Sequence, residues 1–218
     1  MSTLVTGGGD LRLAAGTGTV QISAPTDTDP TGQSLVLTLP QTIGSANQVL
    51  RNSGTAGTLE FADPGKVLQV VNAIKKDTAS TNSTSAVATG LQLSITPKAS
   101  TSKILLTASV GICGTNLNDF GVFYYFGLGG SVITDALGDA DSARTRCGTF
   151  ARSSTTVRGY SSVMVYEHDH DSSSQLTYSL MFSAESGSTA FINRSGNDAD
   201  SANRPRSFST LTAMEISA

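Results

Sequence analysis

From residue 66 onward, apolar and polar residues alternate with the period of a β-strand. Residues 104, 106, 108, 110 and 112 share one apolar face, residues 176, 178, 180 and 182 share another, and residues 208, 210, 212, 214 and 216 share a third. Successive side chains of a strand point to opposite faces, so each stretch can bury one face and expose the other. This pattern predicts an all-β fold.

Eight strand-like stretches separated by polar turns follow one another in this part of the chain. They are residues 67–74, 91–96, 103–113, 120–128, 157–166, 175–184, 189–194 and 206–217. Eight strands are the number found in a jelly roll. The sequence therefore predicts an eight-stranded jelly-roll-like β-sandwich as a head domain over residues 66–218.

Residues 1–65 form a different kind of segment, which ends at a break before the sandwich. Pro64 fixes its φ angle and Gly65 is permissive, so the pair interrupts a strand. The alternating bursts before it are short: 11–13, 20–22, 35–39, and a predicted hairpin of 48–51 and 58–61 around a turn at 52–54. Each burst is too short to hide its apolar face alone. We therefore predict an extended arm that packs in three copies, a homotrimer, and whose residues 1–10 become ordered on a partner.

Composition excludes several classes of function. Charged residues make up 14% of the chain, below the ~25% of ordinary globular domains, and hydroxyl side chains fill the polar positions. This is typical of a virion or extracellular β-protein whose surface is used in subunit contacts. The net charge is −3 with dispersed basic residues, which predicts no nucleic-acid binding. No apolar run approaches the ~20 residues of a membrane span.

Short motifs recur along the arm: Gly9-Asp10-Leu11-Arg12-Leu13, Gly18-Thr19-Val20-Gln21-Ile22, Leu37-Thr38-Leu39-Pro40, Asn47-Gln48-Val49-Leu50 and Leu59-Glu60-Phe61-Ala62-Asp63. They resemble shaft segments of bacteriophage tail fibres, which are usually homotrimers with intertwined β-structure. The sandwich contains a second series of motifs: Gly65-Lys66-Val67-Leu68-Gln69-Val70-Val71, Ile95-Thr96-Pro97-Lys98, Ser102-Lys103-Ile104-Leu105-Leu106, Leu176-Thr177-Tyr178, Phe191-Ile192-Asn193-Arg194 and Leu211-Thr212-Ala213-Met214-Glu215-Ile216. In their order they resemble the C-terminal β-domain of fibre and other structural proteins of phages, especially marine ones.

The resemblance implies a non-enzymatic virion structural protein without a cofactor. We expect a trimeric fibre or spike whose arm attaches to another virion protein of the tail or capsid. Its sandwich would be exposed to contact a glycan or protein of the host surface, and three copies would strengthen weak contacts. A capsid decoration or cement protein is the alternative, and a secreted carbohydrate-binding module is a third hypothesis.

The stretch Phe120–Leu128 is apolar on both faces, since Phe123 and Tyr125 alternate with Val122 and Tyr124. Exposed aromatic side chains are costly in water. One interpretation places this strand at or near a subunit interface. The other has both faces covered within one domain, by the second sheet and by loops.

Two kinds of motif are candidate metal sites. The only histidines are His168 and His170, and three copies of this pair would offer six imidazoles. The alternative is a charged turn after Tyr166, which we favour because Asp171 and three serines follow. The Asp-x-Asp pairs Asp139/Asp141 and Asp198/Asp200 could begin calcium loops, but neither has the glycine and distal glutamate of an EF-hand. Solvated loops are the favoured interpretation, and we predict no metal site.

Catalysis has little support in the sequence. Both histidines lie in one segment, no Gly-x-Ser-x-Gly motif is present, and the chain has no tryptophan, so no nucleophile or glycosidase arrangement is indicated. We predict no catalytic and no cofactor-binding residues. For Cys113 and Cys147 we favour two free, buried thiols over a disulfide.

Overall fold

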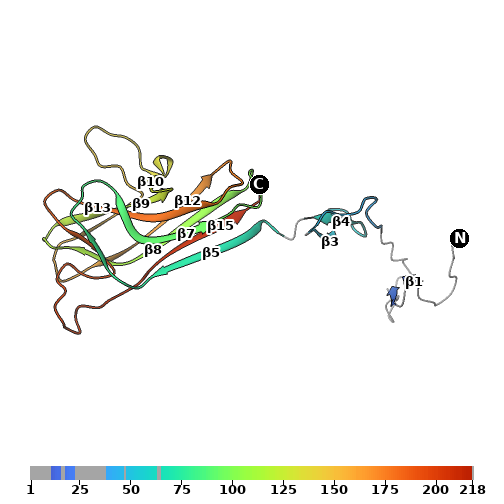
Figure 1. Cartoon of the computed structure of the whole chain (residues 1–218), viewed down its shortest axis with the longest axis horizontal. Coiled ribbons are helices and arrows are strands. Elements are labelled where there is room, and N and C mark those ends of the chain that lie inside the picture. Colours follow the sequence, from blue (N-terminus) through green and yellow to red (C-terminus); the bar gives the residue numbers. More distant parts are fainter. Residues whose placement is uncertain (1–10, 16–17, 23–37, 47, 63–64, 218) are drawn as a thin grey trace. The chain divides into compact units, whose positions relative to one another are not determined.

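The computed structural model describes residues 11–15, 18–22, 38–46, 48–62 and 65–217. The chain divides into two compact units, Met1–Pro64 and Gly65–Ala218 (Figure 1). The described residues form β-strands joined by turns, with one single-turn 3-10 helix, η1, at Thr134–Ala136. The prediction of an all-β protein is therefore confirmed.

The described residues of the first unit form two antiparallel pairs of strands. Strand β1 (Leu11–Ala15) pairs with β2 (Gly18–Ile22), and β3 (Val49–Asn52) pairs with β4 (Leu59–Ala62). The predicted hairpin is confirmed, although its loop is longer than a turn at 52–54: the Ser53 amide donates to the Thr58 carbonyl at 2.8 Å. The expectations for residues 1–10, Leu35 and Leu37 lie outside the described residues.

The second unit contains eleven described strands that form two sheets. Their bounds are β5 Val67–Lys75, β6 Ala79–Thr81, β7 Val87–Ile95, β8 Lys103–Thr115, β9 Phe120–Leu128, β10 Ser131–Val132, β11 Thr149–Ser153, β12 Tyr160–Asp169, β13 Leu176–Ala184, β14 Ala190–Ile192 and β15 Ser209–Ile216.

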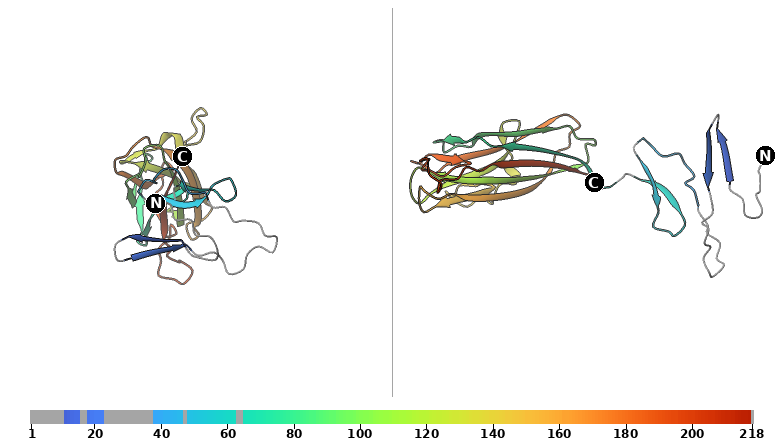
Figure 2. Two further views of the ribbon diagram at one scale, coloured as in Figure 1. Left: turned by 90° about the vertical axis from the view of Figure 1, so that its right-hand side faces the viewer. Right: turned by 90° about the horizontal axis from the view of Figure 1, so that it is seen from below.

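Every strand pairing in this unit is antiparallel. In the first sheet β8 is central: β12 pairs along one side of it, and β15 followed by β14 along the other, with β5 beyond β15 and β6 beyond β14. In the second sheet β9 pairs with β10 and β11 on one side and with β13 on the other, and β7 lies beyond β13. The long strands run side by side through both layers (Figure 2).

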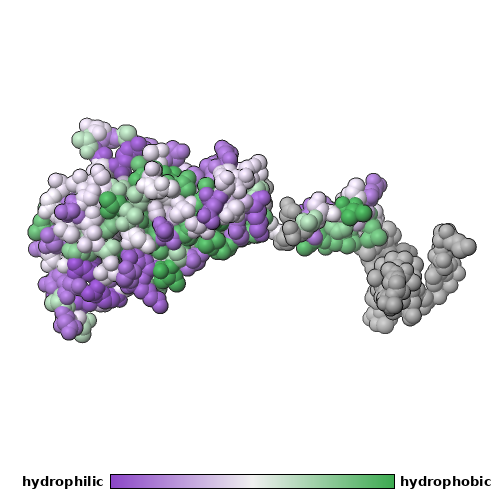
Figure 3. All heavy atoms as spheres, in the orientation of Figure 1, coloured by the Kyte–Doolittle hydropathy of each residue, from purple (hydrophilic) through white to green (hydrophobic). Residues whose placement is uncertain are grey.

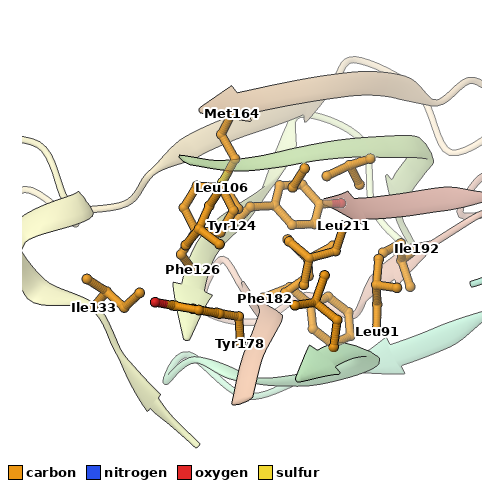
Figure 4. Close-up of a cluster of buried hydrophobic side chains, with 14 of the residues drawn as sticks. Leu91, Leu106, Tyr124, Phe126, Ile133, Met164, Tyr178, Phe182, Ile192 and Leu211 are labelled. Carbon is orange, nitrogen blue, oxygen red and sulfur yellow. The ribbon is translucent and has the colours of Figure 1, made fainter. Parts of the chain in front are cut away.

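The core lies between the two sheets and is built from alternate residues of the long strands. From the first sheet come Ile104, Leu106, Ala108, Leu211 and Ala213, and all five are fully buried. The second sheet contributes Leu91, Tyr124, Phe126, Tyr178, Leu180 and Phe182, which face them (Figure 4). At ~1.5–3 kcal/mol for each large apolar side chain buried, this cluster is the main source of stability.

The structure corrects three details of the predicted strands. The short strands β6, β10 and β11 were not predicted, and β12 begins and ends three residues later than 157–166. Along β15 the face that contains Thr212 and Met214 points outward, because the buried residues are Ser209, Leu211, Ala213 and Glu215. The alternation had the right period there but identified the wrong face as the core.

Gly196 provides a test of how tightly the loop before β15 packs. A Cβ at this position would collide with the Thr115 carbonyl oxygen and lie 3.2 Å from that of Thr156. Backbone atoms cannot rotate away, so Gly196→Ala is expected to destabilise the protein by about 1–3 kcal/mol, the usual cost of overpacking. Thermal unfolding followed by circular dichroism measures it. Gly138→Ala is the control, since a Cβ added there would lie at an ordinary contact distance of 4.0 Å from the Cys147 carbonyl oxygen. Equal melting temperatures for the two variants would contradict the packing described.

Candidate assembly surface

The face of the first sheet that points away from the core is a candidate assembly surface, which we call the outer face. It is a grid of side chains set by strand register, with β12 at one edge and β5 at the other. Its three middle rows are Val163–Ser109–Thr210–Ile74, Val165–Thr107–Thr212–Asn72 and Glu167–Leu105–Met214–Val70.

Both edges of the outer face carry exposed apolar side chains. On β12, Val163 and Val165 are 62% and 59% exposed, and on β5, Val70 and Ile74 are 54% and 57% exposed. Hydrophobic side chains gather along β5 at the lower side of the second unit in Figure 3. β-branched residues in these positions are the kind that pack on a pleated surface. A single copy of the described chain leaves this surface uncovered.

The centre of the outer face is polar but almost free of charge. Thr107, Ser109, Thr210 and Thr212 occupy it, and the Asn72 amide donates to the Thr212 hydroxyl at 2.7 Å. Charge is confined to one end, where the Lys103 ammonium lies 2.8 Å from the Glu167 carboxylate and 3.6 Å from that of Asp169. The hydrogen bond to Glu167 and the nearby Asp169 raise the pKa of Lys103. Such a face can meet another copy of itself without like-charge repulsion over most of its area.

In the second sheet, the face of β9 that points away from the core is covered within its own unit. The Tyr125 hydroxyl lies 2.9 Å from the Ser183 hydroxyl, and Phe123 packs against Phe150 of β11 with ring centroids 4.9 Å apart. Tyr125 is buried, although Phe150 remains partly exposed. Of the two interpretations of Phe120–Leu128, this arrangement favours coverage inside one domain, and the exposed apolar surface lies on the other sheet.

The two histidines lie on β12 and just after it, not in a charged turn that begins at Glu167. His168 Nδ1 is 2.7 Å from the Tyr178 hydroxyl, and His170 Nε2 is 3.3 Å from Ser102 Oγ. Burial is the main cause that lowers the pKa of His168, with the neighbouring imidazole second. The two rings are 6.5 Å apart and each is engaged by protein groups. Within the described ranges, no group of three side chains is arranged to hold a metal ion.

The two Asp-x-Asp motifs lie apart, on opposite sides of the second unit in Figure 1, so they do not combine into one site. Asp141 pairs with Arg144, with Nε and Oδ2 2.8 Å apart. Asp198 accepts from Arg206 at 2.6 Å and lies 3.1 Å from Arg194. These carboxylates are therefore engaged by guanidinium groups, which favours solvated loops over calcium sites.

Cys113 and Cys147 are both free thiols. Cys113 is buried and donates to the Tyr160 carbonyl, and burial raises its pKa to about 11. Cys147 is half-buried, and burial raises its pKa as well. The prediction of two free thiols is confirmed, although only Cys113 is fully buried. Neither has the depressed pKa of a reactive thiolate.

Comparisons with known proteins do not assign the chain to a family: no family model matches it, and the curated proteins include no significant match. Among the described residues, no helix is long and apolar enough to cross a membrane.

Proposed function

We propose that the protein is a non-enzymatic virion structural protein, a homotrimeric fibre or spike. Residues 1–65 attach it to another virion protein, and the sandwich of residues 66–218 is exposed for contact with the host surface. The observation that carries this proposal is the outer face, whose two apolar edges remain uncovered in a single chain.

The strand order of the second unit supports a jelly roll. If its eight long strands β5, β7, β8, β9, β11, β12, β13 and β15 are numbered one to eight, the sheets have the orders 1-8-3-6 and 2-7-4-5. Strands far apart in the chain thus pair in both sheets, as in a rolled-up double hairpin. This is a common fold of viral structural domains, but fold alone does not define function.

The position of the apolar residues supports a ring of copies. The exposed valines of β12 and the exposed Val70 and Ile74 of β5 lie at opposite edges of one sheet. The β12 edge of one copy can pack on the β5 edge of the next, which is a heterologous contact, and such contacts form a ring when the rotation between copies closes. Three copies form the ring that we propose. In the first unit Val49, Leu50 and Phe61 are also exposed, which supports association there too.

The same surfaces also suit a capsid decoration protein, which would assemble as a trimer in the same way. Labelled electron microscopy of virions tests both with an antibody against this chain. Label at the tail supports a fibre or spike, and label over the head lattice supports a decoration protein. Virions that carry no label would contradict the proposed function.

A further inference from the structure

The second unit has a shallow pocket of about 340 Å³, a size within the range of small-ligand sites. It lies where the segment before β12 meets the end of β8 and the loop between β14 and β15. The lining residues are Ile112, Val157, Arg158, Gly159, Tyr160, Ser195, Asn203 and Pro205. We propose that this pocket binds an acidic sugar residue, with Arg158 holding its carboxylate. This deepens the proposed function, on which it rests, by naming the class of host ligand.

The shape of the pocket depends on a close backbone approach. A Cβ on Gly159 would collide with Ile112 and lie 2.8 Å from the Cys113 carbonyl oxygen. The glycine therefore allows the chain to lie directly on β8, where the Cys113 thiol also donates to the Tyr160 carbonyl. Tyr160 is 46% exposed. Its ring thus offers an apolar surface of the kind on which the C–H face of a sugar can rest, and Asn203 adds an amide to the lining of the same pocket.

The charge of the pocket selects an anion. Among the residues that line the pocket, Arg158 is the one with a charged side chain. In the described part of the chain no carboxylate forms an ion pair with Arg158. Nearby, Arg204 has a buried Nε without an acceptor among the described residues. A guanidinium fork matches a carboxylate in a bidentate manner. The net charge of −3 disfavours long polyanions, so a single acidic sugar fits better than a nucleic acid.

The pocket also lies far from the point where the chain enters the second unit. Lys103 at the start of β8 pairs with Ile216, which pairs with Val67 near the point where the chain enters the unit. Ile112 is nine residues further along β8, roughly 30 Å away at the rise of a strand. If the arm is anchored in the particle, the pocket lies at the end of the sandwich that is remote from the anchor.

Ligand-detected saturation-transfer NMR on the full chain tests this inference with methyl glucuronide and with methyl glucoside, which lacks the carboxylate. We expect the glucuronide to bind about tenfold more tightly or better, since hydrogen bonds to charged groups contribute strongly. Arg158→Gln should remove that preference, and Tyr160→Ala should weaken both sugars about fivefold. Arg152→Gln removes an exposed charge on β11, outside the pocket lining, and should change nothing.

Equal binding of the two sugars, or an unchanged preference in Arg158→Gln, would overturn the inference. The solution mass of each sample, measured in parallel, separates this inference from the proposed function. A trimer that does not prefer the glucuronide overturns the pocket assignment alone. A monomer that binds it through Arg158 supports the pocket and contradicts the assembly.

Discussion

Val165→Glu is expected to convert the assembled protein into folded monomers. Val165 lies in the β12 edge of the outer face and is 59% exposed in a single chain. Its replacement therefore has little effect on the stability of one folded copy. In the proposed assembly the same side chain is buried against β5 of the next copy. An unpaired charge buried there costs about 3–5 kcal/mol at each contact, and the ring repeats this cost at every interface.

Analytical ultracentrifugation at micromolar concentration measures the loss of assembly, and circular dichroism checks that the variant remains folded. Gln92→Glu is the matched control, because it adds the same charge at an exposed position of β7, in the other sheet. We expect this control to keep the mass of the parent protein. A Val165→Glu protein that sediments like the parent would show that the outer face is not an interface.

Glu215→Ala is expected to reduce the free energy of unfolding by about 3 kcal/mol or more. The Glu215 side chain is fully buried at the end of β15. Its Oε1 accepts from the Ser102 hydroxyl at 2.6 Å and from the Lys98 amide at 2.7 Å, and its Oε2 accepts from the Gln69 amide at 2.5 Å. The alanine variant would leave several buried donors without an acceptor, each at a cost of about 1–3 kcal/mol.

The same carboxylate predicts a pH dependence. Burial alone would raise the pKa of Glu215, but its hydrogen bonds outweigh burial and lower it below the usual value. The folded protein therefore binds this proton less readily than the unfolded chain does. The stabilisation is complete above the pKa of an unfolded glutamate, about 4.3, and is lost as the pH falls through the lower pKa of the folded state.

Urea unfolding at fixed protein concentration, at pH 7 and at pH 3.5, measures both effects. Glu215→Gln should lose about 2 kcal/mol at pH 7 and should lose less further stability on acidification than the parent does. Asp200→Asn, an exposed substitution in the loop before β15, should have the same stability as the parent protein at both pH values. A glutamine variant with the full acid sensitivity of the parent would show that Glu215 is not the responsible group.

The long strands were predictable because unbroken alternation, or a short run of aromatic and β-branched residues on both faces, indicates a strand. Residues 103–113 and 120–128 read as strands from sequence, and β8 and β9 cover them. Strand β12 was placed too early because Glu167 and Asp169 look like turn residues. In the structure they instead belong to β12, where Glu167 lies opposite Leu105 of β8 and Asp169 lies opposite Lys103. Charged side chains are stable in a strand when a neighbouring strand supplies the opposite charge, and sequence alone does not show which strands are neighbours.

The candidate assembly surface was only partly visible in the sequence for the same reason. Leu105 could be recognised as an apolar residue behind the core residue Ile104. The sequence does not show, however, that Val163 and Ile74 lie in one row of one sheet, because that depends on two intervening strands, β8 and β15. Conversely, the sequence left open whether the aromatic residues of β9 lie at an interface or are covered within one domain, and in the structure Ser183 and Phe150 partner them within the unit.

The solution mass of the full chain at micromolar concentration tests the central claim most directly. Sedimentation or light scattering should give three times the chain mass of 22.4 kDa, and dilution should lower the melting temperature because assembly stabilises the folded state. A folded protein with the mass of one chain, whose melting temperature is independent of concentration, would contradict the account.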